Sequence, residues 1–260
     1  MNIIVCVKQV FDVKDLKLKA GDEFIPHGLD RRVNQFDIFA LEEALTVKDG
    51  NPQAKVIVLS MGADQTSRCL IEGLAMGADK AYLLKTDGFW DTVATSRLLA
   101  EAINKIEEAE GMADIIITGS QSTDSGSGMI PHMLSQILSR KLVSSAAEIR
   151  LIRNNSELEI TKRGYDGFEK VEAAFPLLIS ATKPNHEVRY PTFKRIRQAN
   201  QSEIKVIEPS SPERITSYSE LIRVTKPGRK SKNSIVNDDD AQAGTHSLMR
   251  MLRDDKIFAR

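Results

Sequence analysis

The sequence predicts an α/β fold in which a doubly wound, mostly parallel sheet carries an added hairpin and an extended C-terminal arm. Short, continuous apolar runs recur up to residue 141, as in strands buried on both faces. Between these runs, apolar residues recur at helical spacing. Strands separated by helices indicate a parallel sheet with helices on both faces. After residue 141 the pattern changes to a hairpin signal and then to a polar, charged tail.

Each element of the predicted parallel sheet has its own signal. Four apolar runs predict buried strands at residues 2–7, 55–59, 81–84 and 114–118. Helical spacing predicts helices over residues 37–48 and 64–76, a third after Asp91, and a fourth that begins near Met129. Asp91 is a typical N-cap residue. The apolar stripe of the third helix consists of Ala94, Leu98, Ala102 and Ile106.

The second half of the chain predicts a hairpin, one more strand and an arm. The stretch LEITKRGYDGFEKVEA (158–173) is typical of two strands joined by a Gly-containing turn, and LLISAT (177–182) of another strand. We therefore expect an α/β domain over residues 1–200 and an arm over residues 201–260 with a short amphipathic helix near residues 246–252. Disorder is the alternative for the arm, but five apolar residues give it surface to bury against a partner: Leu221, Ile222, Ile235, Val236 and Leu248.

Composition excludes several classes of protein. Lys plus Arg and Asp plus Glu balance at 36 each, so no overall field attracts the chain to nucleic acid or to a membrane surface, and a local basic patch is the alternative that stays open. No apolar run approaches the roughly 18 residues of a membrane span. Cys6 and Cys69 lie in apolar patterns and form no zinc-type spacing, so we expect two buried reduced thiols. We expect a cytoplasmic protein with no membrane insertion.

A segment of small polar residues follows the fourth predicted strand directly. It lies within ITGSQSTDSGSGMIPHMLSQIL (117–138). In open parallel sheets, ligands bind beyond the carboxyl ends of the strands, and a helix N-terminus presents free N–H groups to anions. Ser125 and Ser127 offer hydroxyl donors, and Asp124 suits a ribose hydroxyl. No Gly-Lys-Ser/Thr follows, so the segment favours a nucleotide that is held rather than cleaved. A polar surface loop that caps a helix is the alternative.

Five stretches occur in an order and spacing that resemble the beta subunit of electron transfer flavoprotein. They are MNIIVCVKQVFD (1–12), NQFDIFALEEALTVKD (34–49), GLAMGADKAYLL (73–84), the loop after ADIIITG (113–119) and HEVRYPTFKRIRQA (186–199). The resemblance covers about residues 1–207 and, more loosely, the arm. It implies an adenine-nucleotide-binding sheet and a heterodimer with an alpha subunit. It also implies an FAD shared with the alpha subunit, and AMP or a second FAD in the beta subunit.

The resemblance also assigns cofactor-binding positions. Cys6 matches a small residue whose backbone meets adenine, Asn34 an Asn at the nucleotide, and Phe36 an aromatic that faces the flavin, although a core aromatic is an equal alternative. Ser60 and Met61 border the adenine. The phosphate loop, with Gln121 before it, corresponds to Asp124, Ser125, Gly126, Ser127, Gly128, Met129 and Ile130.

Two segments depart from the family pattern. The family loop reads Asp-Gly-Asp-Thr-Ala-Gln-Val-Gly; here Gly126 replaces the second acid, Met129 the Gln, and Pro131 the last Gly. These changes leave open which nucleotide binds. In the segment at residues 182–191, through which the family docks dehydrogenases, Asn185 replaces a Leu and Val188 a Pro. The predicted docking residues are Asn185, His186, Glu187, Arg189 and Tyr190, although Arg189 alternatively pairs with an acid of the alpha subunit.

The resemblance implies an electron carrier rather than an enzyme, since flavin supplies the redox chemistry. The four histidines are scattered and none accompanies a recognisable nucleophile. His132 follows the loop and is interpreted mainly as a surface helix residue, with contact to the nucleotide as the alternative. Two other classes stay open. A stand-alone ATP-binding stress-type sensor is disfavoured by the arm and by the segment at residues 34–49. A hydrolase or nucleotidyl transferase is disfavoured by the missing lysine and by the lack of clustered carboxylates near Asp124.

Overall fold

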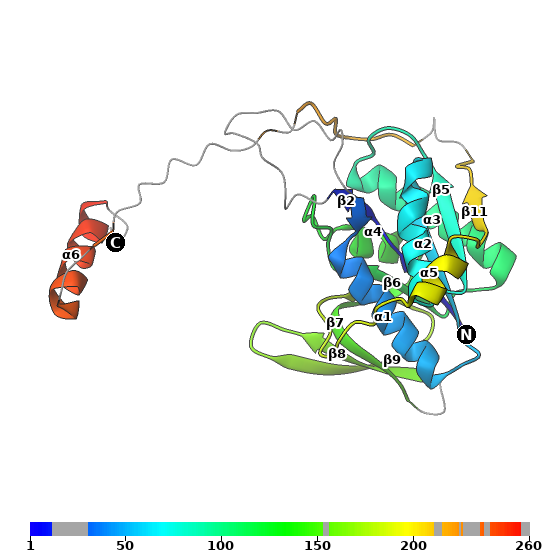
Figure 1. Ribbon diagram of the computed structural model, residues 1–260, viewed down its shortest axis with the longest axis horizontal. Helices are drawn as coiled ribbons and strands as arrows, with labels where there is room; N and C mark the ends of the chain where they lie inside the picture. Colours follow the sequence, from blue (N-terminus) through cyan, green and yellow to red (C-terminus); the bar gives the residue numbers. More distant parts are fainter. Residues whose placement is uncertain are drawn as a thin grey trace. The chain divides into compact units, whose positions relative to one another are not determined.

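The computed structural model describes residues 1–11, 31–152, 156–210, 215–223, 225, 235–236 and 240–255. In these residues, nine strands form one sheet in the order β11-β5-β4-β1-β6-β10-β7-β8-β9 (Figure 1). The parallel strands are β1 (Asn2–Cys6), β4 (Lys55–Gly62), β5 (Lys80–Lys85), β6 (Ile115–Gly119), β10 (Leu177–Ala181) and β11 (Ile204–Ile207). The doubly wound α/β fold predicted from the sequence is confirmed.

The chain reverses its direction of strand addition beside β1. From β1 it passes outward to β4 and β5, and then crosses to β6 on the other side of β1. β1 pairs in parallel with β4 and with β6, so that Cys6 lies opposite Leu59 on one side and opposite Thr118 on the other. The carboxyl ends of β1 and β6 therefore form a topological switch point, where open α/β sheets bind their ligands.

Helices cover both faces of the sheet. The first face packs against α1 (Gln35–Gly50) and α2 (Ser67–Met76), and the second against α3 (Thr92–Glu110) and α4 (Ile130–Ile137). Successive strand residues alternate between the two cores, with Ile3 and Val5 on the first face and Ile4 and Cys6 on the second. Asp91 caps α3 by accepting the N–H of Ala94, as predicted.

The hairpin predicted after residue 157 is confirmed and extends the sheet. β7 (Lys141–Ile152), β8 (Glu157–Arg163) and β9 (Phe168–Ala174) pair antiparallel, while β7 pairs in parallel with β10. The sequence analysis did not foresee β7. It also missed β2 (Gln9–Phe11) and β3 (Arg31–Val33), which form a separate two-stranded sheet.

Three elements lie after residue 190. α5 (Phe193–Ala199) packs beside α2, where Arg195 donates to the carbonyl of Met76. β11 pairs with β5 at the edge of the sheet, although its residues belong to the predicted arm. The amphipathic helix expected near residues 246–252 is α6 (Ala241–Asp254).

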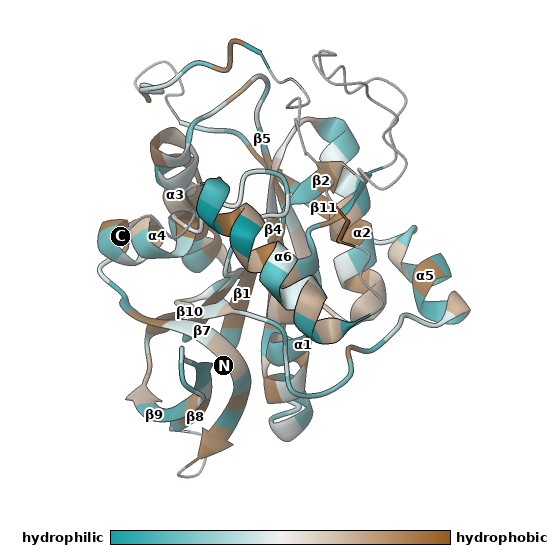
Figure 2. Cartoon of the chain, turned by 90° about the vertical axis from the view of Figure 1, so that its left-hand side faces the viewer, coloured by the Kyte–Doolittle hydropathy of each residue, from teal (hydrophilic) through white to brown (hydrophobic). Residues whose placement is uncertain are grey.

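The chain separates into two compact units, the first with the described residues through Ile222 and the second with those from Arg223 onward. In the second unit, α6 buries none of its residues, and Figure 2 shows both hydrophilic and hydrophobic positions along it. Leu248 is 48% exposed. Among the described helices, none combines the length and the apolar content needed to cross a membrane.

Candidate functional site

The predicted polar loop lies at the switch point of the sheet. It follows β6 directly and leads into α4. Its first residue, Ser120, donates its N–H to the carbonyl of Ala181 at the end of β10 (2.8 Å). The loop thus begins at the carboxyl end of one strand and is anchored to the end of its neighbour, so its position is set by the sheet.

Asn34 fastens the loop to the start of α1. Its side chain is buried, its Nδ2 donates to the carbonyl of Gln121 (2.9 Å), and its Oδ1 accepts the N–H of Thr123 (3.0 Å). The backbone N–H of Asn34 donates to the carbonyl of Lys8, just beyond β1 (2.8 Å). Since each end of the Asn34 amide makes a hydrogen bond within the chain, this residue shapes the loop.

Asp37 joins the carboxyl ends of the two strands that flank the switch point. It lies in the first turn of α1, and its carboxylate accepts the N–H of Lys8 after β1 (2.7 Å) and that of Gly119 at the end of β6 (3.1 Å). Burial raises the pKa of Asp37 to about 7, against the lowering effect of these N–H donors. The sequence analysis did not single out Asp37; its place three residues after Asn34 was the available signal.

Gly119 is required by the close approach of α1. A Cβ at this position would lie 2.3 Å from Oδ1 of Asp37 and 2.8 Å from Cβ of Phe36. Only glycine lets the end of β6 reach the Asp37 carboxylate. The packing of α1 against β6 therefore explains why glycine occupies position 119, directly before the loop.

Asp124 forms the charged centre of the loop. Its carboxylate contacts Nζ of Lys8 at 2.7 and 2.9 Å and accepts the N–H of Ser125 (2.7 Å). Although burial opposes the shift, hydrogen bonds and the charge of Lys8 hold the pKa of Asp124 below its ordinary value. The sequence analysis did not single out Lys8 either, because a lysine after a strand is ordinarily a solvated residue.

The loop's N–H groups divide into used and free donors. Those of Ser125 and Gly126 donate to Asp124 and to the carbonyl of Ser122. In the described part of the chain, those of Ser127 and Gly128 have no partner. Gly126 and Gly128 adopt left-handed φ values of 64° and 63°, which glycine reaches without strain. These turns leave free donors ahead of α4, an arrangement that suits an anion.

The loop ends at the N-terminus of α4. Met129 is the N-cap residue without a side-chain cap bond, and Pro131 occupies the first turn, where a missing N–H costs little. Ile130 is half-buried. His132 is exposed and its Nδ1 lies 3.1 Å from the carbonyl of Gly128. His132 is thus a helix-surface residue, as its main interpretation expected, and it also contacts the backbone of the loop.

The remaining positions assigned to adenine and flavin lie close to the strand ends. Burial, with the charge of Asp37, raises the pKa of the Cys6 thiol to about 12, and the thiols of Cys6 and Cys69 are both free and buried, as predicted. Ser60 is buried and donates to the carbonyl of Val7 (2.7 Å), while Met61 packs at the rim of the second core. Phe36 is half-buried and contacts Phe39 edge-on.

The predicted docking segment is tied to α1. Arg189 binds Glu42 through its backbone N–H and its guanidinium, and also contacts Asp49 (2.7 Å). His186 lies 3.6 Å from the buried Glu43, whose pKa burial raises to about 8. Asn185 and Glu187 are exposed, and Tyr190 is 91% exposed. Arg189 therefore finds its acids within this chain, while its neighbours face outward.

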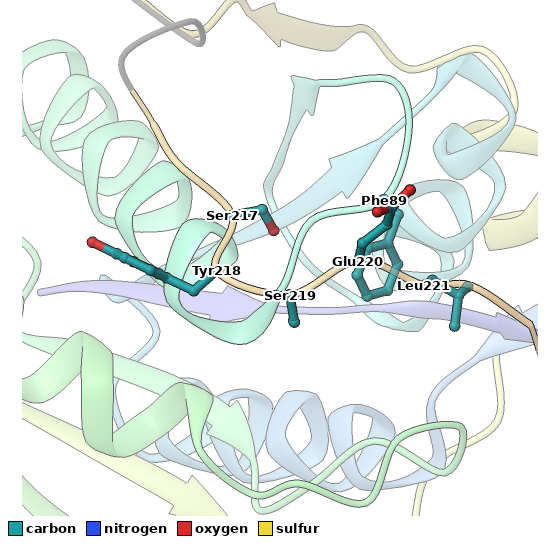
Figure 3. A pocket seen from close by; sticks show the side chains of 6 residues that line it. All are labelled: Phe89, Ser217, Tyr218, Ser219, Glu220 and Leu221. Atoms are coloured by element: carbon teal, nitrogen blue, oxygen red, sulfur yellow. The ribbon is translucent and has the colours of Figure 1, made fainter.

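A separate hollow of about 490 Å³ is lined by Phe89 and residues 217–221 (Figure 3). Asp91 holds this segment by accepting the N–H groups of Tyr218 and Ser219. The hollow shares no residue with the polar loop. No group of His, Cys, Asp and Glu within the described ranges is arranged to hold a metal ion.

Comparisons with known proteins agree on one family. The family model described as electron transfer flavoprotein domain matches residues 23–212. The electron transfer flavoprotein subunit beta of Megasphaera elsdenii is 33% identical to this chain, with 99% of the chain and 100% of the relative aligned. Subunit CarD of the caffeyl-CoA reductase-Etf complex of Acetobacterium woodii is 31% identical, with 99% and 100% aligned. Protein FixA of Azorhizobium caulinodans is 30% identical, with 79% and 74% aligned.

Proposed function

Because the chain belongs to the beta-subunit family of electron transfer flavoproteins, we propose that it pairs with an alpha subunit, shares an FAD with it and itself binds an adenosine phosphate. The family resemblance drawn from the sequence motifs is confirmed, and the role of the family is electron transfer rather than catalysis of a substrate reaction. The adenosine phosphate is AMP or the adenosine half of a second FAD.

One observation carries the nucleotide part of the proposal. A polar loop in which the N–H groups of Ser127 and Gly128 have no acceptor among the described residues lies at the switch point and leads into a helix N-terminus. Free N–H groups ahead of a helix are a common phosphate site. Asn34 and Asp37 fix the first part of the loop, from Gly119 to Thr123, within the chain itself. A preformed loop of this kind loses little conformational entropy on binding.

The flavin supplies the redox chemistry when it is bound, and the chain supplies binding and orientation. In this proposal the backbone near Cys6, Ser60 and Met61 borders the adenine, and Gln121 and the residues from Asp124 to Ile130 surround the phosphates. Phe36, at the start of α1, faces the shared flavin. The raised thiol pKa of Cys6 is consistent with a backbone role, since the sulfur stays protonated at neutral pH.

We assign partner contacts to two segments. Within residues 201–260, β11 belongs to the sheet, and the residues after it form the arm that packs on the alpha subunit. The exposed apolar residues of α6 support this role. A dehydrogenase docks on Asn185, His186, Glu187 and Tyr190. Arg189 contributes to docking by holding this segment in place, because its bonds to Glu42 and Asp49 fix the segment on α1.

The test is Gly128→Val in the complex coexpressed with its alpha subunit. A Cβ at Gly128 would lie 3.3 Å from the carbonyl oxygen of Ser120, and φ of 63° strains any branched residue. The variant should lose the adenosine phosphate of the beta subunit and keep the shared FAD. Gly88→Val is the matched control, since Gly88 also has a positive φ but its Cβ would meet nothing within 4 Å. Full nucleotide content in Gly128→Val would contradict the loop assignment.

A further inference from the structure

We propose that Lys8 supplies the positive charge for the nucleotide phosphate, and that Asp124 is the counter-ion which holds Lys8 in the nucleotide-free site and yields it to the phosphate. This inference rests on the proposed function, since it concerns the same adenosine phosphate. It gives Asp124 a role different from that of a ribose ligand, so the two roles are separable by experiment.

The backbone of Lys8 is fixed at the switch point on both sides. Its N–H donates to the buried carboxylate of Asp37 (2.7 Å), and its carbonyl accepts the N–H of Asn34 (2.8 Å). Its side chain is half-exposed and extends to the loop, where Nζ contacts Asp124. Substitution of the side chain therefore leaves intact the two backbone bonds that position this residue.

The carboxylate of Asp124 occupies donors that suit an anionic ligand. It binds the Lys8 ammonium and the Ser125 N–H together, through one pair of oxygens. A tetrahedral phosphate also offers pairs of oxygens, with more negative charge than a carboxylate, and its further oxygens are available to the free N–H groups of Ser127 and Gly128. Phosphate binding at this loop thus competes directly with Asp124 for Lys8.

The exchange is easy because the ion pair is at the surface. The side chains of Lys8 and Asp124 are 50% and 36% exposed, and such pairs contribute little to stability. The loop itself, residues 120–129, contains no Lys or Arg. Lys8 is therefore the cation that contacts the loop in the described structure, and without Lys8 the negative charge of Asp124 would oppose phosphate binding.

The experiment measures AMP and adenosine binding by calorimetry to the full complex after removal of its bound nucleotide. The variants are Lys8→Met, Lys8→Arg and Asp124→Asn. Lys8→Met should weaken AMP binding about tenfold, the typical effect of one charge-assisted hydrogen bond, while Lys8→Arg stays near wild type. Asp124→Asn should tighten AMP binding several-fold. Adenosine, which lacks the phosphate, should bind all four proteins equally.

Two results would overturn the inference while leaving the proposed function intact. The first is unchanged AMP affinity in Lys8→Met. The second is weaker binding of both AMP and adenosine by Asp124→Asn, which would make Asp124 a ribose ligand. Wild-type complex that binds neither AMP nor FAD at the beta subunit would instead overturn the proposed function, and the role of Lys8 with it.

Discussion

Replacement of Asn34 by Ala should release the polar loop without unfolding the sheet. The change removes two hydrogen bonds, one to the carbonyl of Gln121 and one from the N–H of Thr123. Each such bond contributes about 1 kcal/mol net, so the loop should lose about 2 kcal/mol of local stability. By the relation of 1.36 kcal/mol per factor of ten, its opening becomes about 30-fold more frequent.

Amide hydrogen exchange of the coexpressed complex measures this effect directly. Exchange at Thr123 should accelerate about 30-fold, while exchange at β1 and β6 stays unchanged, and the adenosine phosphate content should fall. Gln35→Ala is the control, because Gln35 is the exposed neighbour on the same helix. Asn34→Asp should resemble Asn34→Ala, since one carboxylate oxygen would face the Gln121 carbonyl. Unchanged exchange at Thr123 in Asn34→Ala would refute the view that Asn34 organises the loop.

Two further predictions concern the residues beneath the loop. The pKa of Asp37 is raised from 3.8 to about 7, so the folded state binds this proton more tightly than the unfolded state. Its contribution to stability is therefore present below about pH 4 and is lost as pH rises through 7, by up to about 4 kcal/mol. When the free energy of urea unfolding is plotted against pH between 5 and 8, the slope should be flatter for Asp37→Asn than for the wild type. An equal slope in both proteins would refute this. Gly119→Ala should destabilise the protein by about 3 kcal/mol through overpacking against Asp37. Gly88→Ala, with open space around its Cβ, should cost only about 1 kcal/mol, so equal melting temperatures for the two variants would contradict the packing argument.

The central sheet was predictable because burial on both faces leaves a continuous apolar signal. The run at the N-terminus and the run before Gly119 became β1 and β6 with bounds within about a residue of the prediction. In contrast, β7 carries polar residues such as Ser144, Ser145 and Glu148 without a regular alternation, and it pairs in parallel on one side and antiparallel on the other. Neither feature follows from local periodicity. β2 and β3 have only three residues each, too few to show a period.

The location of the site was predictable from the sequence, but the contacts that build it were not. Topology located the loop, because a polar segment after a buried strand lies at the carboxyl edge of a parallel sheet. The bonds of Asn34, Asp37 and Lys8 that build the site join residues at least 26 positions apart in the chain. Such contacts depend on the packing of α1 against β6. A single sequence therefore shows these residues only as a polar start to a helix and a lysine after a strand.

The nucleotide content of the wild-type complex tests the central claim most directly. The chain is coexpressed with its alpha subunit, the purified complex is denatured, and released FAD and AMP are quantified per heterodimer. The account predicts two adenine nucleotides per heterodimer, either one FAD with one AMP or two FAD. One FAD alone would contradict a nucleotide site at the polar loop, and ATP without flavin would contradict the assignment of this chain to a flavin-containing heterodimer.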